Sequence, residues 1–181
     1  FSLLFLSCQE KKEKEIIKSK KTTIERKQPK EVAYTFQKSA DWLKTEGSNS
    51  NAMDIVLALN RVDLANLKKL DSIVVPTDAS GDLAFYMPFP LEVSTLDEVK
   101  KAILFSYTTQ TFATYEYGTL RQVGPTSMGS KIHKTPTGLF FTNWKAEETN
   151  STFNDEWLLK WNFNIENELG VGFHEYELPG Y

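Results

Sequence analysis

Residues 102–174 consist of short β-forming runs separated by turn residues, and this pattern constrains the fold more than any other feature of the sequence. The runs are rich in β-branched and aromatic residues, which favour strands, and Gly118 between two of them favours a tight turn. Many short strands at this spacing are typical of antiparallel β sandwiches. We therefore predict a mainly β fold, with strands at residues 102–107, 111–117, 119–123, 138–144, 157–163 and 171–174.

Residues 34–78 show helical rather than alternating periodicity and predict a small separate segment. Apolar residues recur on one helical face, first over residues 53–59 and again over residues 63–70, after a short helix start at residues 39–43. Residues 73–75 before Pro76 predict a short strand, because proline cannot continue a central strand. The segment is therefore expected to be a small α+β unit that precedes the main domain.

Two strings in this segment, NRVDLANL at residues 60–67 and LDSIVVP at residues 70–76, resemble the second half of a LysM module. The resemblance implies binding of N-acetylglucosamine polymers. Leu70 stands where that family usually has glycine, and no clear first strand precedes the helices. Two interpretations stay open: a glycan-binding module, or a degenerate copy that serves packing only.

The first eight residues, FSLLFLSC, form an apolar run that ends in a cysteine. A membrane-spanning helix needs about 20 apolar residues, so this run is too short to span a bilayer. It resembles the end of a bacterial signal peptide with a lipobox, which implies that Cys8 carries a lipid anchor. The protein would then be a lipoprotein of the cell envelope, facing the periplasm or the extracellular side. The alternative is a buried N-terminal strand with an inert cysteine.

Residues 9–31 carry nine basic and five acidic side chains and few apolar ones, which predicts a flexible charged tether. The whole chain has a formal net charge of -3, which gives no reason to expect nucleic acid as a partner. A single cysteine excludes an internal disulfide and a multi-cysteine zinc site, and no pair of histidines has the spacing of a zinc peptidase. We predict neither a metal nor a cofactor.

Four phrases in the second half of the chain resemble the L,D-transpeptidase (YkuD-like) catalytic domain, in order and over about residues 100–181. They are QTFATYEYG at residues 110–118, GPTSMGS at 124–130, TPTGLF at 135–140 and GFH at 172–174. The resemblance implies a β sandwich, here expected at residues 95–181, that acts on peptidoglycan stem peptides and glycan.

The resemblance also implies roles for particular residues. His174 takes the position of the family's general base, although Glu175 follows it where glycine or serine is common. Substrate-binding positions are implied for Thr135, Pro136, Thr137, Gly138 and Tyr176. In the family reaction a cysteine thiolate attacks a tetrapeptide stem, expels D-alanine and passes the acyl group to an amine of a neighbouring stem, which makes a 3-3 crosslink.

The family's nucleophile follows the histidine by about 15 to 20 residues in a Ser-His-Gly-Cys motif, which would lie beyond Tyr181. We therefore expect the 181-residue chain to lack its nucleophile and to be inactive, and the full-length parent to be an L,D-transpeptidase. Two other functions remain open: a noncatalytic peptidoglycan-binding lipoprotein, and an L,D-carboxypeptidase relative. His133 is expected at the surface, and Trp144, Trp157 and Trp161 in the core or the cleft wall rather than as sugar platforms.

Overall fold

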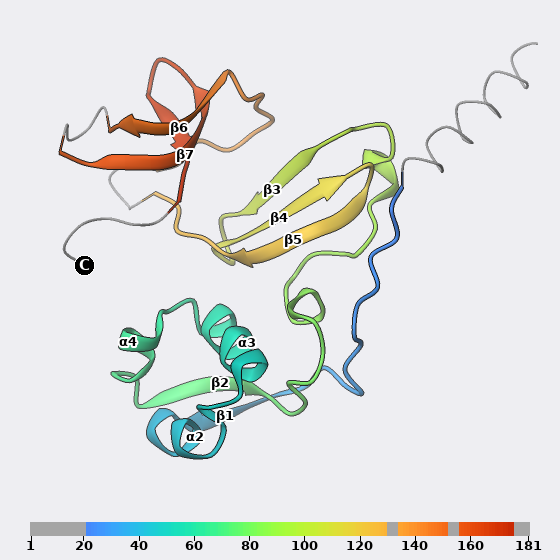
Figure 1. Ribbon diagram of the computed structural model, residues 1–181, viewed down its shortest axis with the longest axis vertical. Coiled ribbons are helices and arrows are strands. Elements are labelled where there is room, and N and C mark those ends of the chain that lie inside the picture. Colours follow the sequence, from blue (N-terminus) through green and yellow to red (C-terminus); the bar gives the residue numbers. More distant parts are fainter. Residues whose placement is uncertain (1–20, 130–133, 152–155, 176–181) are drawn as a thin grey trace, which may run out of the picture. The chain divides into compact units, whose positions relative to one another are not determined.

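The computed structural model describes residues 21–129, 134–151 and 156–175 (Figure 1). The chain divides into two compact units, one ending at Ser127 and the other beginning at Met128. The described residues form three small antiparallel sheets and few, short helices. The prediction of a mainly β fold is confirmed. Within these residues no helix has the length and apolar character needed to cross a membrane.

The first sheet pairs β1 (Tyr34–Lys38) with β2 (Ser72–Pro76), and the helices lie between these strands in sequence. They are α2 (Ser39–Glu46), α3 (Ser50–Asn60) and α4 (Leu64–Leu67). The Asn49 and Asp63 side chains cap α3 and α4, each accepting a hydrogen bond from a first-turn amide. Strand β1 is the first strand that the sequence did not show. Nothing in the sequence pointed to it because all five β1 residues are exposed, so they do not alternate between buried and exposed.

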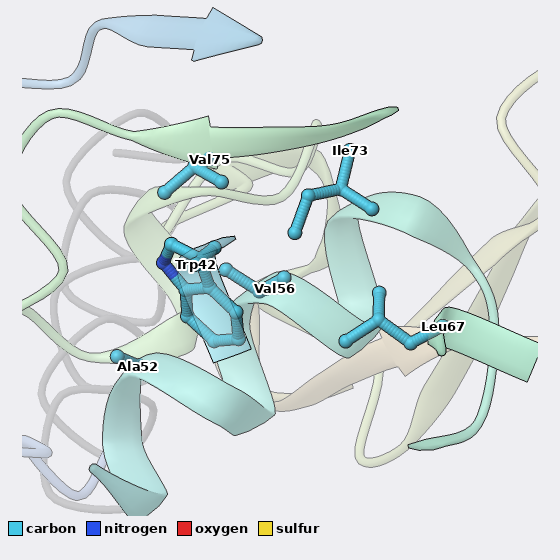
Figure 2. Close-up of a cluster of buried hydrophobic side chains, with 6 residues drawn as sticks. All are labelled: Trp42, Ala52, Val56, Leu67, Ile73 and Val75. Carbon is cyan, nitrogen blue, oxygen red and sulfur yellow. The ribbon is translucent and has the colours of Figure 1, made fainter. Parts of the chain in front are cut away.

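An apolar core joins α2, α3 and α4 to β2 (Figure 2). Ile73 and Val75 alternate along β2 and point to the same face, toward the helices. The buried side chains of this cluster are Trp42, Ala52, Val56, Leu67, Ile73 and Val75. The amide group of Asn60 fastens α3 to β2, since its Nδ2 donates to the Val74 carbonyl and its Oδ1 accepts from the Val74 amide, both at 2.8 Å.

The second sheet has the order β3–β4–β5 and also belongs to the first unit. Its strands are β3 (Ala102–Ser106), β4 (Thr111–Glu116) and β5 (Thr119–Pro125). Tyr117 and Gly118 join β4 to β5 with φ values of 47° and 74°, as a type I′ turn requires. A Cβ at Gly118 would lie 2.4 Å from Asp97 Oδ1 and 2.6 Å from the Val93 carbonyl, so the turn admits only glycine. The predicted turn at Gly118 is confirmed.

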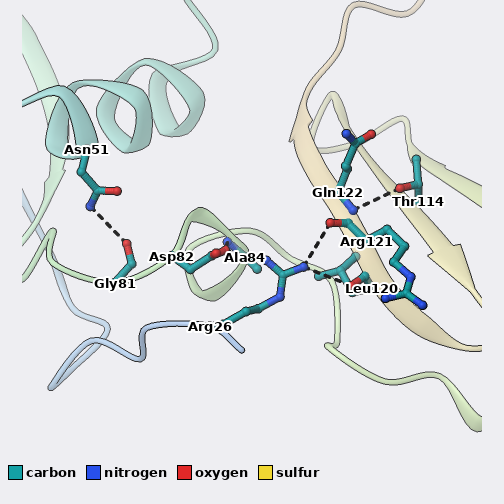
Figure 3. A network of polar contacts seen from close by, with 9 residues as sticks. All are labelled: Arg26, Asn51, Gly81, Asp82, Ala84, Thr114, Leu120, Arg121 and Gln122. Atoms are coloured by element: carbon teal, nitrogen blue, oxygen red, sulfur yellow. Dashed lines mark hydrogen bonds and ion pairs between the residues drawn. The ribbon is translucent and has the colours of Figure 1, made fainter. Parts of the chain in front are cut away.

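Residues 21–31 overlap the predicted tether, and we call them the strap. Within the first unit the strap runs along both sheets and contacts residues near each of them. Arg26 Nη1 lies 2.8 Å from Asp82 Oδ1, and Nη2 donates to the carbonyl oxygens of Leu120 and Arg121 at 3.0 and 3.1 Å (Figure 3). Lys21 Nζ lies 2.6 Å from Asp97 Oδ1, and this hydrogen bond raises the pKa of Lys21. The strap therefore connects the loop after β2 with strand β5.

The strap is also held by backbone groups. The amides of Lys30 and Ser80 donate to the Asp78 carboxylate, each at 2.8 Å, and these two bonds lower the pKa of Asp78. Pro29 is buried against Gly81, where a Cβ would lie 2.5 Å from the proline ring. Polar and steric contacts together therefore specify the path of residues 26–30.

The third sheet makes up the second unit, in the order β6–β7–β8. Its strands are β6 (Trp144–Asn150), β7 (Leu158–Glu166) and β8 (Val171–Phe173). The predicted strand at residues 138–144 is wrong, because β6 begins only at Trp144. Gly138 has φ 145°, Leu139 and Phe141 are 86% and 77% exposed, and residues 138–142 pair with no strand in the described structure. Their apolar character suggested a strand, whereas the actual strand is the polar sequence WKAEETN.

Candidate functional site: the β7–β8 hairpin and His174

The β7–β8 hairpin places His174 directly after its second strand. Phe163 pairs with Phe173 and Asn164 with Gly172, and the rings of Phe163 and Phe173 stack with centroids 4.9 Å apart. His174 follows Phe173 and is exposed to solvent. Strand pairing and ring stacking therefore hold the backbone that carries the imidazole.

Asn164 holds the turn of this hairpin together. Its side chain is buried, and its Nδ2 donates to the carbonyls of Glu166 and Val171, at 3.1 and 3.3 Å, on either side of the turn. Its Oδ1 accepts from Asn143 Nδ2 at 3.0 Å. One buried amide thus fixes the register shift between Asn164 and Glu166, and sequence reasoning gave no sign of this role.

The backbone beside His174 determines which ring nitrogen carries the proton. His174 Nδ1 lies 2.7 Å from the carbonyl oxygen of Glu175. A carbonyl oxygen only accepts hydrogen bonds, so Nδ1 must carry the hydrogen, and the lone pair of the neutral ring is then on Nε2. Within the described ranges no hydrogen bond to Nε2 is found. The neutral imidazole is therefore exposed and carries its lone pair on Nε2.

The register of β7 with the chain after β8 slips by one residue at Trp161. Continuing the pairing of Phe163 with Phe173 would bring Glu175 opposite Trp161, but the Glu175 amide donates to the Lys160 carbonyl at 3.0 Å. Trp161 has a φ of 52°, which lies in the left-handed region. The pairing of β7 with β6 keeps one register on both sides of Trp161, so β7 contains no inserted residue there.

The TPTG phrase lies before β6 in the same unit as His174. Thr135 Oγ1 accepts a hydrogen bond from the Gly129 amide at 3.0 Å. Thr135 and Pro136 are half-buried, whereas Thr137 and Gly138 are exposed. In the described part of the chain no hydrogen bond joins residues 135–138 to His174, so their substrate-binding roles stay predictions.

Three residues named from the sequence, Cys8, His133 and Tyr176, lie outside the described residues. Among the described residues no group of three or more His, Cys, Asp or Glu side chains could hold a metal ion. A pocket of about 370 Å³ lies in the first unit and is lined by strap residues, Phe85, residues 91–92 and residues 119–120; neither His174 nor the TPTG phrase lines it.

The chain was also compared with known proteins. Residues 100–181 match the L,D-transpeptidase (YkuD) catalytic domain. The match covers the same residues as the resemblance found in the sequence, so that resemblance is confirmed. Members of this family act on peptidoglycan. No curated protein and no solved structure matches the chain.

The L,D-transpeptidase match begins at Lys100, two residues before β3, and so includes the second and third sheets. A mainly β fold built of small sheets is consistent with the β sandwich of that family. His174 and the TPTG phrase both lie within the matched residues. Trp161, Asn164 and Gly172 also lie there, and sequence reasoning assigned no positioning role to any of them.

Gly172, on the strand that precedes His174, has no room for a side chain. A Cβ there would lie 2.6 Å from the Phe163 carbonyl oxygen and 2.9 Å from Asn162 Oδ1. We expect Gly172→Ala to destabilise the β7–β8 hairpin by about 1–3 kcal/mol, the usual cost of overpacking. Amide hydrogen exchange at Glu175, which bonds across this hairpin, should become about tenfold faster or more.

The matched control for Gly172→Ala is Lys145→Ala, which removes an exposed side chain from β6 of the same sheet. Exchange at Glu175 should be unaffected by that change. Unchanged exchange in Gly172→Ala would show that the hairpin accommodates a methyl group and that Gly172 does not hold His174 in place.

Proposed function

We propose that residues 100–181 are part of an L,D-transpeptidase catalytic domain in which His174 is the general base. The observation that carries the proposal is the contact of His174 Nδ1 with the Glu175 carbonyl, within the segment that matches the family. This contact leaves Nε2 as the basic nitrogen. The exposure of the ring also gives a thiol and a peptide access to it.

In the proposed reaction His174 Nε2 accepts the proton of a cysteine thiol, because the thiolate rather than the thiol is the nucleophile. The thiolate attacks the amide that joins the third residue of a tetrapeptide stem to its terminal D-alanine. Nε2 then returns the proton to the departing D-alanine nitrogen, which leaves a thioester. Because Nδ1 already donates to a carbonyl, the imidazolium formed in between is stabilised without any movement of the ring.

The thiol itself does not come from residues 9–181, which contain no cysteine. The one cysteine, Cys8, precedes His174 by more than 160 residues and lies before the strap. We propose that the nucleophile is supplied from outside the 181 residues and that the chain by itself does not catalyse acyl transfer. A second stem then takes up the acyl group through its side-chain amine and forms a 3-3 crosslink.

The test compares the 181-residue chain with the product of its complete gene. Each is incubated with tetrapeptide stems, and D-alanine and crosslinked dimers are measured by mass spectrometry. We expect both products from the complete gene product, their loss after alkylation of thiols, and neither product from the 181-residue chain. D-alanine without dimers would instead identify an L,D-carboxypeptidase.

A noncatalytic peptidoglycan-binding function is the second candidate, and the first sheet favours it. Strand β1 supplies the first strand that the LysM resemblance lacked, so that the helices are now flanked by two paired strands. In the same experiment, absence of D-alanine release from the complete gene product would contradict the transpeptidase proposal. Co-sedimentation of that inactive protein with insoluble peptidoglycan, reversed by N-acetylglucosamine oligomers, would then support the binding function.

A further inference from the structure

The pocket in the first unit has no part in the proposed reaction, and we call it the strap pocket. Its volume of about 370 Å³ lies within the range of small-molecule binding sites. One wall is made by residues 21–24 and Arg26 of the strap, and the other by Phe85, residues 91–92 and residues 119–120. Hydrogen bonds hold these walls in place, which the next contacts show.

Both walls of the strap pocket are tied to strand β5. Glu92 and Thr119 form an antiparallel bridge, and the Leu120 amide donates to the Leu91 carbonyl at 2.9 Å. From the strap, Arg26 Nη2 donates to the Leu120 carbonyl at 3.0 Å (Figure 3). The pocket is therefore built by contacts within the first unit, and such preorganisation lowers the cost of binding a ligand.

The charges around the strap pocket compensate one another. Lys21 Nζ lies 2.6 Å from Asp97 Oδ1 and 3.6 Å from Glu92 Oε2, and Arg26 Nη1 lies 2.8 Å from Asp82 Oδ1. Because each cation already has a carboxylate partner, an anionic ligand would have to displace that partner. A cationic ligand would meet the ammonium group of Lys21 next to Glu92. The pocket therefore suits a neutral ligand.

The pocket also offers polar groups with spare hydrogen-bonding capacity. Thr22 and Thr23 are exposed, and within the described residues their hydroxyl groups make no hydrogen bond. Glu92 Oε2 accepts from Thr119 Oγ1 at 3.1 Å, whereas Oε1 has no partner in the part of the chain that the structure describes. Hydroxyl groups donate and accept, and a carboxylate accepts, so a ligand rich in hydroxyl and amide groups would be satisfied here.

Apolar side chains complete the lining of the strap pocket. They are Ile24, Phe85, Leu91 and Leu120. A sugar ring matches such a mixed lining, because its hydroxyl groups lie around the rim and its C–H groups form apolar faces. An acetamido group adds an amide and a methyl group. The family that matches residues 100–181 acts on peptidoglycan, whose glycan strands consist of N-acetylated sugars of this kind.

We propose that the strap pocket binds an N-acetylated sugar unit of the glycan strand. This inference rests on the proposed function for the identity of the polymer, and it adds a contact with that polymer away from His174. The site is also distinct from the segment that resembles a LysM module, because no residue of 34–78 lines the pocket.

The test measures binding by amide NMR of the isotope-labelled 181-residue chain. One probe is the β-linked disaccharide of N-acetylglucosamine, which is neutral, and the other is a tetrapeptide stem, which carries carboxylates. With the disaccharide we expect the amide resonances of residues 21–24, 91–92 and 119–120 to shift, and those of residues 50–67 to stay unchanged. The stem peptide should leave the resonances of the pocket residues unchanged.

Substitutions in the pocket should weaken binding of the disaccharide. Glu92→Ala removes the carboxylate acceptor and should lower the affinity about tenfold, whereas Thr23→Val removes a neutral hydroxyl group and should lower it about two- to tenfold. Glu98→Ala is the matched control for Glu92→Ala, since Glu98 is an exposed acidic residue of the same unit that does not line the pocket. It should leave the affinity unchanged. Unaltered resonances of residues 34–78 would show that each variant is folded.

Three results would overturn the assignment. They are shifts confined to residues 50–67, which would place sugar binding in the LysM-like segment, shifts of the pocket residues with the stem peptide alone, and no shift at millimolar disaccharide. Failure of the proposed function would be recognised separately, as absence of D-alanine release from the complete gene product. The binding measurement requires no nucleophile and is independent of that result.

Discussion

Replacing His174 with alanine should reduce D-alanine release by the complete gene product at least ~100-fold, the usual scale for loss of a general base. Without the imidazole, the thiol remains largely protonated near neutral pH, and the departing nitrogen has no proton donor. The rate is measured with tetrapeptide stems under saturating conditions, so that a change in binding is not read as a change in chemistry. Added imidazole should restore part of the rate.

The sequence offers a matched control, because it contains only two histidines. His133→Ala should keep the rate within about threefold, since the resemblance assigns the base position to His174. Full activity of His174→Ala would remove this residue from the mechanism. Loss of activity in both variants would indicate that either substitution disturbs the folded domain, and would not identify His174 as the base.

Arg26→Ala should destabilise the first unit by about 2–3 kcal/mol. The Arg26 side chain is 11% exposed, and its guanidinium bonds to Asp82 and to the carbonyls of Leu120 and Arg121. Hydrogen bonds to charged groups contribute about 1.5–3 kcal/mol, and removing one partner of a buried pair leaves the others without compensation. For a unit of this size the melting temperature should fall by roughly 10 °C in a thermal unfolding experiment.

Two further substitutions in the strap make this prediction specific. Arg26→Lys keeps the charge but loses the planar fork that reaches three acceptors, so an intermediate loss of stability is expected. Lys27→Ala removes an exposed side chain next to Arg26 and should change stability by less than about 0.5 kcal/mol. An unaltered melting temperature in Arg26→Ala would mean that the strap does not stabilise the unit and that residues 21–31 behave as a tether.

Features that depend on neighbouring residues could be predicted from the sequence. The Tyr117–Gly118 turn follows from local conformational preferences, and β4 follows from its alternation of side chains. His174 was found by its place in an ordered set of motifs, and the family match at residues 100–181 confirms that resemblance. Helix α3 was found by the periodicity of its apolar residues.

Features that depend on distant residues could not be predicted. The strap looked like a tether because its own composition is charged, and the partners of Arg26 lie 56 to 95 residues away. Strand β6 is polar and becomes a strand only by pairing with β7. The sequence by itself determined the fold class, the turns and the identity of the candidate base, because these follow from local chemistry and motif order. Only the tertiary structure decided the tautomer of His174 and the contacts of the strap, because the first depends on the carbonyl that Nδ1 meets and the second on partners far along the chain.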